Sequence, residues 1–236
     1  MGQRGPATCS IIIPTLDEAA TIARSLRLVR ERAPGAEVIV VDGESRDATA
    51  ALARPLADQV IVTRRGRGRQ INAGARAAGG EVLLMLHADT VPDAGGVERM
   101  LAALAEPEVL GGAFRLRFDD PRPVYAAIAE QIARRSLRTK SYTGDQAIFI
   151  RRAGFFDLDG CRPWQFMEDV DLSERMARRG RNVLLDASVE TSARRHRRWG
   201  LPRTQATVVL IRALYLARVH PDRYAWLWPE VRECVE

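Results

Sequence analysis

The sequence has almost no lysine and few cysteines. Lys140 is the sole lysine among 36 basic residues, so arginine carries the net charge of +6. The arginines are spread along the chain, which indicates a compositional habit rather than a surface built for nucleic acid. The three cysteines, Cys9, Cys161 and Cys234, are far apart and have neither metal-site nor disulfide spacing. This pattern favours a reducing compartment.

Long apolar runs are also missing. No stretch reaches the ~18 consecutive apolar residues of a membrane-spanning helix, and the residues before Thr8 lack the apolar core of a signal peptide. We therefore expect a cytoplasmic protein, for which a peripheral position at the inner face of the membrane is the alternative. At 236 residues and 46% hydrophobic content, the chain can bury a substantial core. It has no repeat, low-complexity tract or long linker, so we expect a single domain over 1–236.

Short apolar runs alternate with helical patterns in the first half of the chain. β-Branched and other apolar runs predict strands over 9–14, 37–41, 59–63 and 82–86. Helical patterns fall between them at 19–32, after Asp47 as an N-cap, and at 70–78. This alternation is typical of a parallel sheet, so the expected fold class is α/β, with a mostly parallel central sheet flanked by helices.

The second half is less regular. Its patterns predict helices over 97–104, 124–137, 166–178 and 202–219, and strands over 112–118, 146–150, 182–185 and 189–193. The last helix is rich in apolar residues. It can pack on the domain, pair with a second copy in a homodimer, or make peripheral membrane contact through 202–219, and we favour packing.

The stretch Glu81–Thr90 carries the strongest functional signal. Five apolar residues run into His87-Ala-Asp89-Thr, and Pro92 closes the strand. Ligands of open α/β sheets bind beyond the carboxyl ends of the strands. His87 and Asp89, two residues apart, can point the same way. A carboxylate there can hold a divalent metal and, through it, a diphosphate. The alternative is that Asp89 only begins a turn or caps the next helix.

Polar residues follow the other predicted strands in the same way. Asp17 and Glu18 follow the first strand, Asp42 follows the second, and an Arg-Gly loop containing Arg69 follows the third. The carboxyl ends of parallel strands lie side by side, so these groups should meet His87 and Asp89 at one crevice. Singly each group reads as a solvated turn residue, but together they favour a nucleotide site.

Six segments in order along 9–200 resemble the inverting family 2 glycosyltransferases, which have the GT-A fold. They are SIIIPTLDE at 10–18, VVDGESRDAT at 40–49, GRGRQINAG at 66–74, LMLHAD at 84–89, GDQAIFIRR at 144–152 and MEDVDL at 167–172. The Gly-Asp-Gln and Met-Glu-Asp blocks are most similar to a small bacterial subgroup of this family.

The resemblance implies a site for a nucleotide-diphosphate sugar. It assigns the nucleoside, usually uridine, to Pro14, Thr15, Glu18, Asp42 and Arg69. Asp89 matches the last residue of the family's Asp-x-Asp motif and would hold Mn²⁺ or Mg²⁺. His87 replaces the first Asp of that motif. It can ligate the metal, contact a phosphate, or do neither.

The resemblance also makes Asp169 the general base. Inversion needs one carboxylate that takes the proton of the attacking hydroxyl. The alternative for Glu168-Asp-Val-Asp171 is that these acids stabilise a helix N-terminus. Candidates on the acceptor side are Gly144, Asp145, Gln146, Trp164, Glu168, Arg198 and Trp199, with Asp171 and Phe166 as further candidates. Trp164 and Phe166 can equally be packing residues. Arg195-His-Arg-Arg-Trp199 only weakly matches the Gln-x-x-Arg-Trp segment of processive relatives.

These observations predict an inverting glycosyltransferase that uses a nucleotide-diphosphate sugar, with a UDP-sugar favoured, and an unidentified hydroxyl acceptor. Residues 9–90 would bind the donor, 91–200 would carry the acceptor and catalytic groups, and 201–236 would form a helical extension. A nucleotidyltransferase is less favoured because no Gly-rich, Lys-bearing loop follows the first strand. A basic nucleic-acid or membrane-surface module built on 195–198 and the last helix leaves Asp42, Asp89 and Asp169 unexplained.

Overall fold

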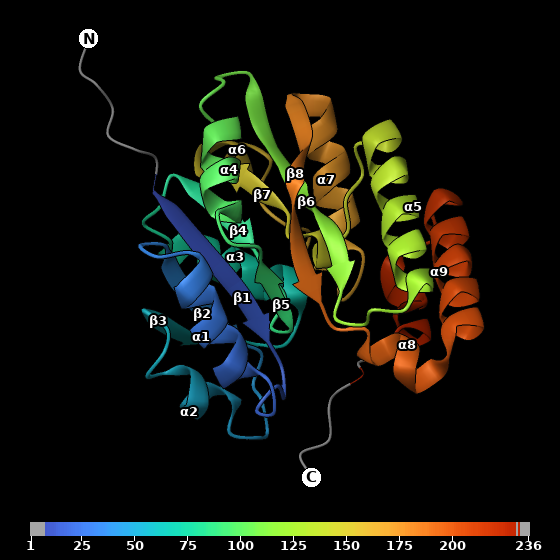
Figure 1. Ribbon diagram of the computed structural model, residues 1–236, viewed down its shortest axis with the longest axis horizontal. Helices are drawn as coiled ribbons and strands as arrows, with labels where there is room; N and C mark the ends of the chain where they lie inside the picture. Colours follow the sequence, from blue (N-terminus) through green and yellow to red (C-terminus); the bar gives the residue numbers. More distant parts are fainter. Residues whose placement is uncertain (1–7, 230, 232–236) are drawn as a thin grey trace.

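The computed structural model describes residues 8–229 and 231. Within them, eight strands form one sheet in the order β3-β2-β1-β4-β7-β6-β8-β5 (Figure 1). The strands are β1 Cys9–Thr15, β2 Glu37–Asp42, β3 Gln59–Val62, β4 Val82–Met85, β5 Thr90–Pro92, β6 Val109–Phe118, β7 Phe149–Arg151 and β8 Arg181–Thr191. The predicted α/β class is confirmed.

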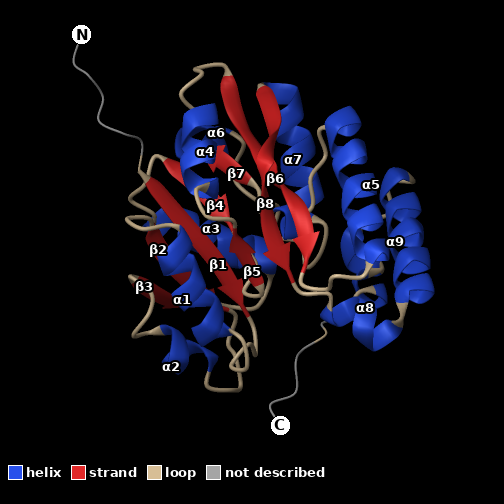
Figure 2. Cartoon of the chain, viewed as in Figure 1, coloured by secondary structure: helices blue, strands red, loops and turns tan. Residues whose placement is uncertain are grey.

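Helices cover both faces of this sheet (Figure 2). They are α1 Ile22–Arg32, α2 Thr49–Ala53, α3 Arg67–Ala77, α4 Gly96–Ala103, α5 Pro123–Thr139, α6 Arg152–Asp157, α7 Glu168–Arg179, α8 Arg194–Trp199 and α9 Leu201–Leu216. Short 3₁₀ turns occur at Gly144–Gln146, Pro221–Arg223 and Ala225–Leu227.

The central strands are buried on both faces, as their continuous apolar runs predict. In β1, Ile11 and Ile13 enter a core cluster with α1, α2 and α4, whereas Ile12 enters a second cluster with α3, α6 and α7. β2 and β4 divide their side chains between the two clusters in the same way. Each fully buried Ile contributes about 1.5–3 kcal/mol, so these strands fix the sheet as the middle layer of three.

The pairing directions place the strand ends. β3, β2, β1 and β4 run parallel, whereas β7 is antiparallel to both β4 and β6. β6 and β8 are again parallel, and β5 is antiparallel to β8 at the sheet edge. The carboxyl ends of β1, β2, β3 and β4 therefore open on one side, and the turn that begins at Gly144 reaches that side just before β7.

Several predicted boundaries are wrong. The two strands predicted over 182–185 and 189–193 are one strand, β8, which ends at Thr191. Residues 90–92 form the short strand β5 directly after the turn at His87. Pro92 is tolerated there because edge strands need not donate every backbone hydrogen bond. Asp47 lies one residue before the α2 N-cap, where its carboxylate accepts from the backbone N–H of Thr49. Helices α6 and α8 were not predicted.

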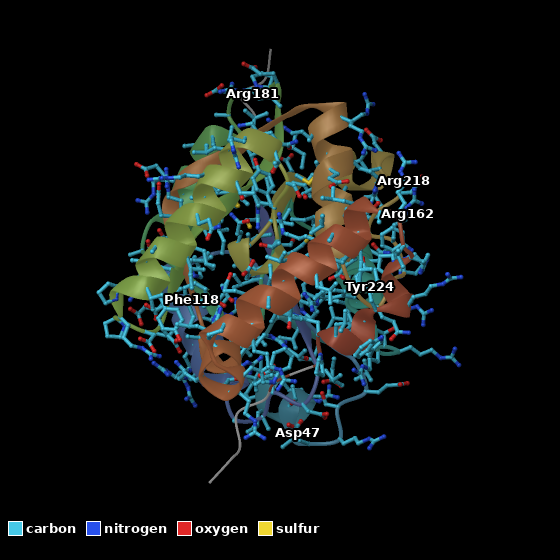
Figure 3. All side chains as sticks on the ribbon, turned by 90° about the vertical axis from the view of Figure 1, so that its right-hand side faces the viewer. Asp47, Phe118, Arg162, Arg181, Arg218 and Tyr224 are labelled. Atoms are coloured by element: carbon cyan, nitrogen blue, oxygen red, sulfur yellow. The ribbon has the colours of Figure 1, made fainter. Side chains whose placement is uncertain are left out.

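The last helix packs on the domain through a small third cluster. Ile211 of α9 belongs to a cluster with Met167, the N-cap of α7, Val170 in the first turn of α7, and Tyr224. Figure 3 views this side, where α9 lies between α5 and the segment with Tyr224. Val209, Leu210 and Leu216 of α9 remain exposed. No helix in 8–229 is long and apolar enough to cross a bilayer. Cys9 and Cys161 are buried free thiols, and Cys234 is outside the described residues.

Candidate active site

A cleft of about 1850 Å³ opens where the strand ends and the N-termini of α3 and α7 meet. Helices α5 and α9 form its other wall. Ligand pockets usually measure 300–1,000 Å³, so the cleft has room for two substrates side by side.

Four of the five residues assigned to the nucleoside line the cleft: Pro14, Thr15, Glu18 and Arg69. Asp42 is buried behind Thr15 and is not among the described lining residues. Its carboxylate accepts from Thr15 Oγ1 at 3.4 Å and from the backbone N–H of Ser45 at 2.9 Å. In this structure Asp42 orients the cleft wall.

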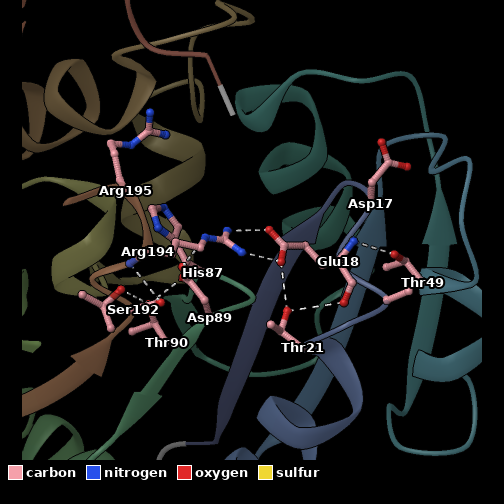
Figure 4. A network of polar contacts seen from close by, with 12 residues as sticks. Asp17, Glu18, Thr21, Thr49, His87, Asp89, Thr90, Ser192, Arg194 and Arg195 are labelled. Carbon is pink, nitrogen blue, oxygen red and sulfur yellow. Dashed lines mark hydrogen bonds and ion pairs between the residues drawn. The ribbon is translucent and has the colours of Figure 1, made fainter. Parts of the chain in front are cut away.

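Arg194, at the start of α8, bridges the two acidic positions at the strand ends (Figure 4). Its two terminal nitrogens donate to Glu18 at 2.6 and 2.8 Å, and its Nε lies 3.2 Å from Asp89 Oδ2. All three side chains are less than a fifth exposed. The end of β1, the end of β4 and the segment after β8 are thus held together by one guanidinium.

The electrostatics of His87 and Asp89 follow from this crowding. Burial raises the pKa of Asp89, Arg194 opposes that rise, and Glu18 adds to it. Burial lowers the pKa of His87 well below its usual range, and the positive charges of Arg67, Arg194 and Arg195 lower it further. At neutral pH the imidazole is therefore uncharged.

Arg67, at the start of α3, links His87 to a buried acid. Its NH1 lies 3.2 Å from His87 Nε2, and its Nε lies 3.3 Å from Glu168 Oε1. A guanidinium can only donate, so Nε2 of His87 is the acceptor and Nδ1 carries the proton. α3 reaches this position because Gly74, where a Cβ would lie 2.5 Å from Ile12 Cγ2, lets the helix sit directly on β1.

Asp169 lies in the first turn of α7 and lines the cleft. Its two oxygens accept from the backbone N–H groups of Gly144 at 2.6 Å and Val170 at 2.7 Å. A Cβ on Gly144 would lie 2.6 Å from His87 Nε2 and 3.2 Å from Asp169 Oδ2. Only glycine fits between these side chains, so the Gly-Asp-Gln turn fixes the position of Asp169.

The neighbouring acids of α7 have different surroundings. Glu168 is fully buried beneath the cleft wall, and neither of its oxygens has a hydrogen-bond partner among the residues described. Burial raises its pKa to about 7 against the attraction of Arg67. Asp171 pairs with Arg175 at 2.7 Å, which is a structural role. The N-terminus of α7 therefore carries three acids with three different environments.

The other predicted acceptor-side residues are divided. Asp145 and Phe166 line the cleft, and Asp145 Oδ1 is buried without a hydrogen bond. Gln146 is fully buried behind them. Among the described residues, Trp164, Arg198 and Trp199 do not belong to the lining: Trp164 packs edge-on to His220, Arg198 is exposed, and Trp199 stacks under Arg195 at 4.8 Å.

A divalent cation would find one carboxylate, Asp89, at the end of β4. Across 8–229 and 231, no three His, Cys, Asp or Glu side chains are grouped to hold a metal. A single carboxylate suits a cation whose remaining ligands are substrate phosphates and water. His87 adds no free ligand atom through Nε2, which already accepts from Arg67.

The arginines of the cleft that sequence reasoning missed include Arg67, Arg135, Arg194 and Arg212. Arg67 lies in the Arg-Gly loop that the sequence analysis singled out, two residues before Arg69, the arginine chosen there. Arg212 had a usable signal, because it is the lone charge within the apolar run 208–216. Arg135 and Arg194 had none, since they reach the cleft only through the folding of α5 and β8.

Comparison with solved structures identifies the fold. A mannosyltransferase from Pyrobaculum calidifontis, in complex with GDP-Man and Mn²⁺, has a TM-score of 0.70 at 23% identity, over 92% of this chain and 65% of that one. S. aureus TarS 1–349 with UDP-GlcNAc gives 0.66 at 20%, over 79% and 59%. Glucosyl-3-phosphoglycerate synthase from Mycobacterium tuberculosis gives 0.55 at 19%, over 79% and 70%.

At these identities the likeness establishes the GT-A fold, and the chain spans no more than about two thirds of the first few structures it matches. Curated protein sequences give no match. The family model described as glycosyl transferase family 2 matches residues 10–161, which is more than half of the chain and includes the cleft residues Glu18 and Asp89. The chain belongs to glycosyl transferase family 2.

Proposed function

We propose that this glycosyltransferase is an inverting enzyme that moves a sugar from a nucleotide-diphosphate sugar, preferably a UDP-sugar, to a hydroxyl acceptor. The observation that carries the proposal is the shared cleft of Asp89 and Asp169, one at the end of β4 and the other on α7. Complexes with GDP-Man and with UDP-GlcNAc among the structural neighbours support a nucleotide-sugar donor.

The donor would lie over the ends of β1 and β4. Thr15 and Glu18 would contact the nucleoside, with Asp42 ordering Thr15 from behind. Arg67 and Arg69, at the N-terminus of α3, would face the diphosphate, since guanidinium groups and glycine-rich helix starts both bind phosphate. His87 would donate its remaining ring N–H, which makes phosphate contact a better role for it than metal ligation.

A divalent metal would be held by Asp89 together with the diphosphate. When bound, it supplies positive charge to the leaving diphosphate. Mn²⁺ in the Pyrobaculum calidifontis and Mycobacterium tuberculosis structures supports this assignment. A cation at Asp89 competes with Arg194, which lies 3.2 Å from Asp89 Oδ2, so Arg194 would keep Glu18 as its partner or shift toward the phosphates.

Asp169 would act as the base. As the acceptor oxygen attacks the anomeric carbon, its proton passes to an Asp169 oxygen. The new bond joins that oxygen to the anomeric carbon, and the carbon–oxygen bond to the diphosphate breaks with its electron pair leaving on the nucleoside diphosphate. Attack opposite the leaving group inverts the anomeric centre. The Gly144 and Val170 N–H groups fix the carboxylate for this transfer.

Titration calorimetry with UDP, GDP, dTDP and CDP, each with and without Mn²⁺, tests the proposal. We expect one diphosphate to bind in a metal-dependent manner and to lose binding in Asp89→Ala. Asp93→Ala is the matched control, because Asp93 follows β5 and pairs with Arg117 at 2.9 Å. The absence of metal-linked binding for all four diphosphates would refute the mechanism.

A further inference from the structure

Two arginines belong to the wall of the cleft that α5 and α9 form. Arg135 belongs to α5 and Arg212 to α9, and both line the cleft that contains Asp169. The two helices lie side by side in Figures 1 and 3. Both side chains are half-buried. Their charges are partly desolvated, which costs more free energy than an arginine on the open surface.

Neither arginine forms an ion pair with a residue that the structure describes. Arg135 donates to Gln146 Oε1 at 3.3 Å, whereas its Nε is buried without a partner. Arg212 makes no hydrogen bond or ion pair with any described residue in 8–229 and 231. Buried donors are almost always satisfied by protein, water or a ligand, so the buried Nε of Arg135 indicates a missing partner. The donors of Arg212 are not buried, and they line the same cleft, where they can bind that partner too.

The electrostatics of the pair agree with this geometry. Burial, and next the positive charge of Arg212, lower the pKa of Arg135 to about 10. Burial lowers the pKa of Arg212 as well. Both groups stay charged at neutral pH. Two cations that are desolvated and repel each other form a site that an anion stabilises.

Nearby carboxylates do not supply that anion. Asp169 accepts two backbone hydrogen bonds, and Glu174 accepts from Tyr215 at 3.2 Å. Asp145 and Asp169 act on both arginines only at longer range, where their attraction fails to offset burial. No carboxylate within 8–229 therefore pairs with these two arginines, and the cleft leaves room for a ligand to do so.

We propose that the acceptor is an anionic hydroxyl compound whose phosphate or carboxylate binds between Arg135 and Arg212, which brings its hydroxyl to Asp169. Guanidinium groups match the planar fork of carboxylate and phosphate oxygens. The substrate class rests on the transfer reaction proposed above. Its source is either a soluble phosphorylated or carboxylated alcohol, or a lipid headgroup reached past the exposed Val209 and Leu210 of α9.

The first experiment measures binding of glycerol 3-phosphate against neutral glycerol, with UDP and Mn²⁺ saturating so that the diphosphate region is filled. Wild type should bind glycerol 3-phosphate and not glycerol. Arg135→Gln and Arg212→Gln should each weaken that binding at least tenfold, since a charged hydrogen bond contributes about 1.5–3 kcal/mol. Arg27→Gln, exposed on α1 and outside the lining, should leave binding unchanged.

The second experiment measures co-sedimentation with phosphatidylcholine vesicles, with and without phosphatidylglycerol. Binding that needs phosphatidylglycerol and is lost in Arg135→Gln or Arg212→Gln identifies a lipid headgroup. If the two variants lose binding of glycerol 3-phosphate but not of the vesicles, the acceptor is a soluble compound.

The inference is overturned if wild type and both variants bind glycerol 3-phosphate equally and also bind phosphatidylglycerol vesicles equally. It is also overturned if wild type prefers neither glycerol 3-phosphate over glycerol nor phosphatidylglycerol vesicles over phosphatidylcholine vesicles. UDP–Mn²⁺ binding, read in the same samples, should be unchanged in the variants. If wild type itself binds no nucleotide, the proposed transfer reaction is refuted rather than the anion site. The anion site is then tested by repeating the glycerol 3-phosphate titration without nucleotide.

Discussion

Glu168 should make the stability of the protein fall as the pH rises toward neutrality. It is fully buried, and within the described part of the chain its oxygens have no hydrogen bond and form an ion pair with Arg67 Nε at 3.3 Å. Burial raises its pKa from the ordinary 4.5 to about 7. The folded protein therefore keeps a proton that the unfolded chain has released. Between these two pH values, each pH unit removes up to about 1.4 kcal/mol of stability.

The perturbation is Glu168→Gln, which keeps the shape of the side chain and removes its titration. Over pH 5 to 8, the free energy of unfolding of the variant minus that of wild type should rise by roughly 2–3 kcal/mol. Any pH-independent effect of the amide, such as its weaker attraction for Arg67, cancels from this change. The histidines and other acids titrate in both proteins and cancel as well.

Urea unfolding followed by tryptophan fluorescence at unit pH intervals measures the change. Glu81→Gln, an exposed Glu at the start of the β4 segment, is the matched control and should run parallel to wild type. Parallel stability curves for wild type and Glu168→Gln would refute the reasoning, because they would mean that Glu168 ionises alike in the folded and unfolded chains.

Two substitutions test the polar core of the cleft. Arg194→Ala leaves Glu18 and Asp89 without the guanidinium that bridges them, so it should cost about 3 kcal/mol of stability. Mn²⁺ should restore more of the melting temperature in this variant than in wild type, and equal restoration would contradict the bridging role. Gly144→Ala places a Cβ 2.6 Å from His87 Nε2 and should slow transfer at least tenfold with an unchanged circular dichroism spectrum. A rate equal to that of wild type would show that the turn tolerates a side chain.

The sequence predicted the elements whose burial pattern is local. The runs at 9–14, 37–41 and 82–86 became β1, β2 and β4, because strands covered on both faces read as continuous apolar segments. β8 was split in two because Asp186 interrupts its apolar pattern, and the structure leaves this side chain fully exposed in the middle of the strand. β5 is three residues long and exists through its pairing with β8, which no local pattern encodes.

In the cleft, too, local patterns in the sequence predict some residues, whereas long-range contacts place others that no local pattern predicts. His87, Asp89 and Asp169 could be selected because they follow strands or begin a helix in recognisable segments, and all three line the cleft. Arg194 could not, since its place between Glu18 and Asp89 depends on contacts across more than 100 residues. Long-range ion pairs leave no periodicity in the sequence. The assignment of Asp169 as the base stays a prediction.

Release of nucleoside diphosphate from the donor sugar, measured in wild type and in Asp169→Asn, tests the central claim most directly. The donor is the sugar nucleotide whose diphosphate binds with Mn²⁺, and glycerol 3-phosphate serves as acceptor. We expect Asp169→Asn to bind the diphosphate as wild type does and to release it about 10²–10⁴-fold more slowly, the usual contribution of a general base. Equal release rates at equal binding would contradict the role of Asp169 and, with it, the proposed mechanism.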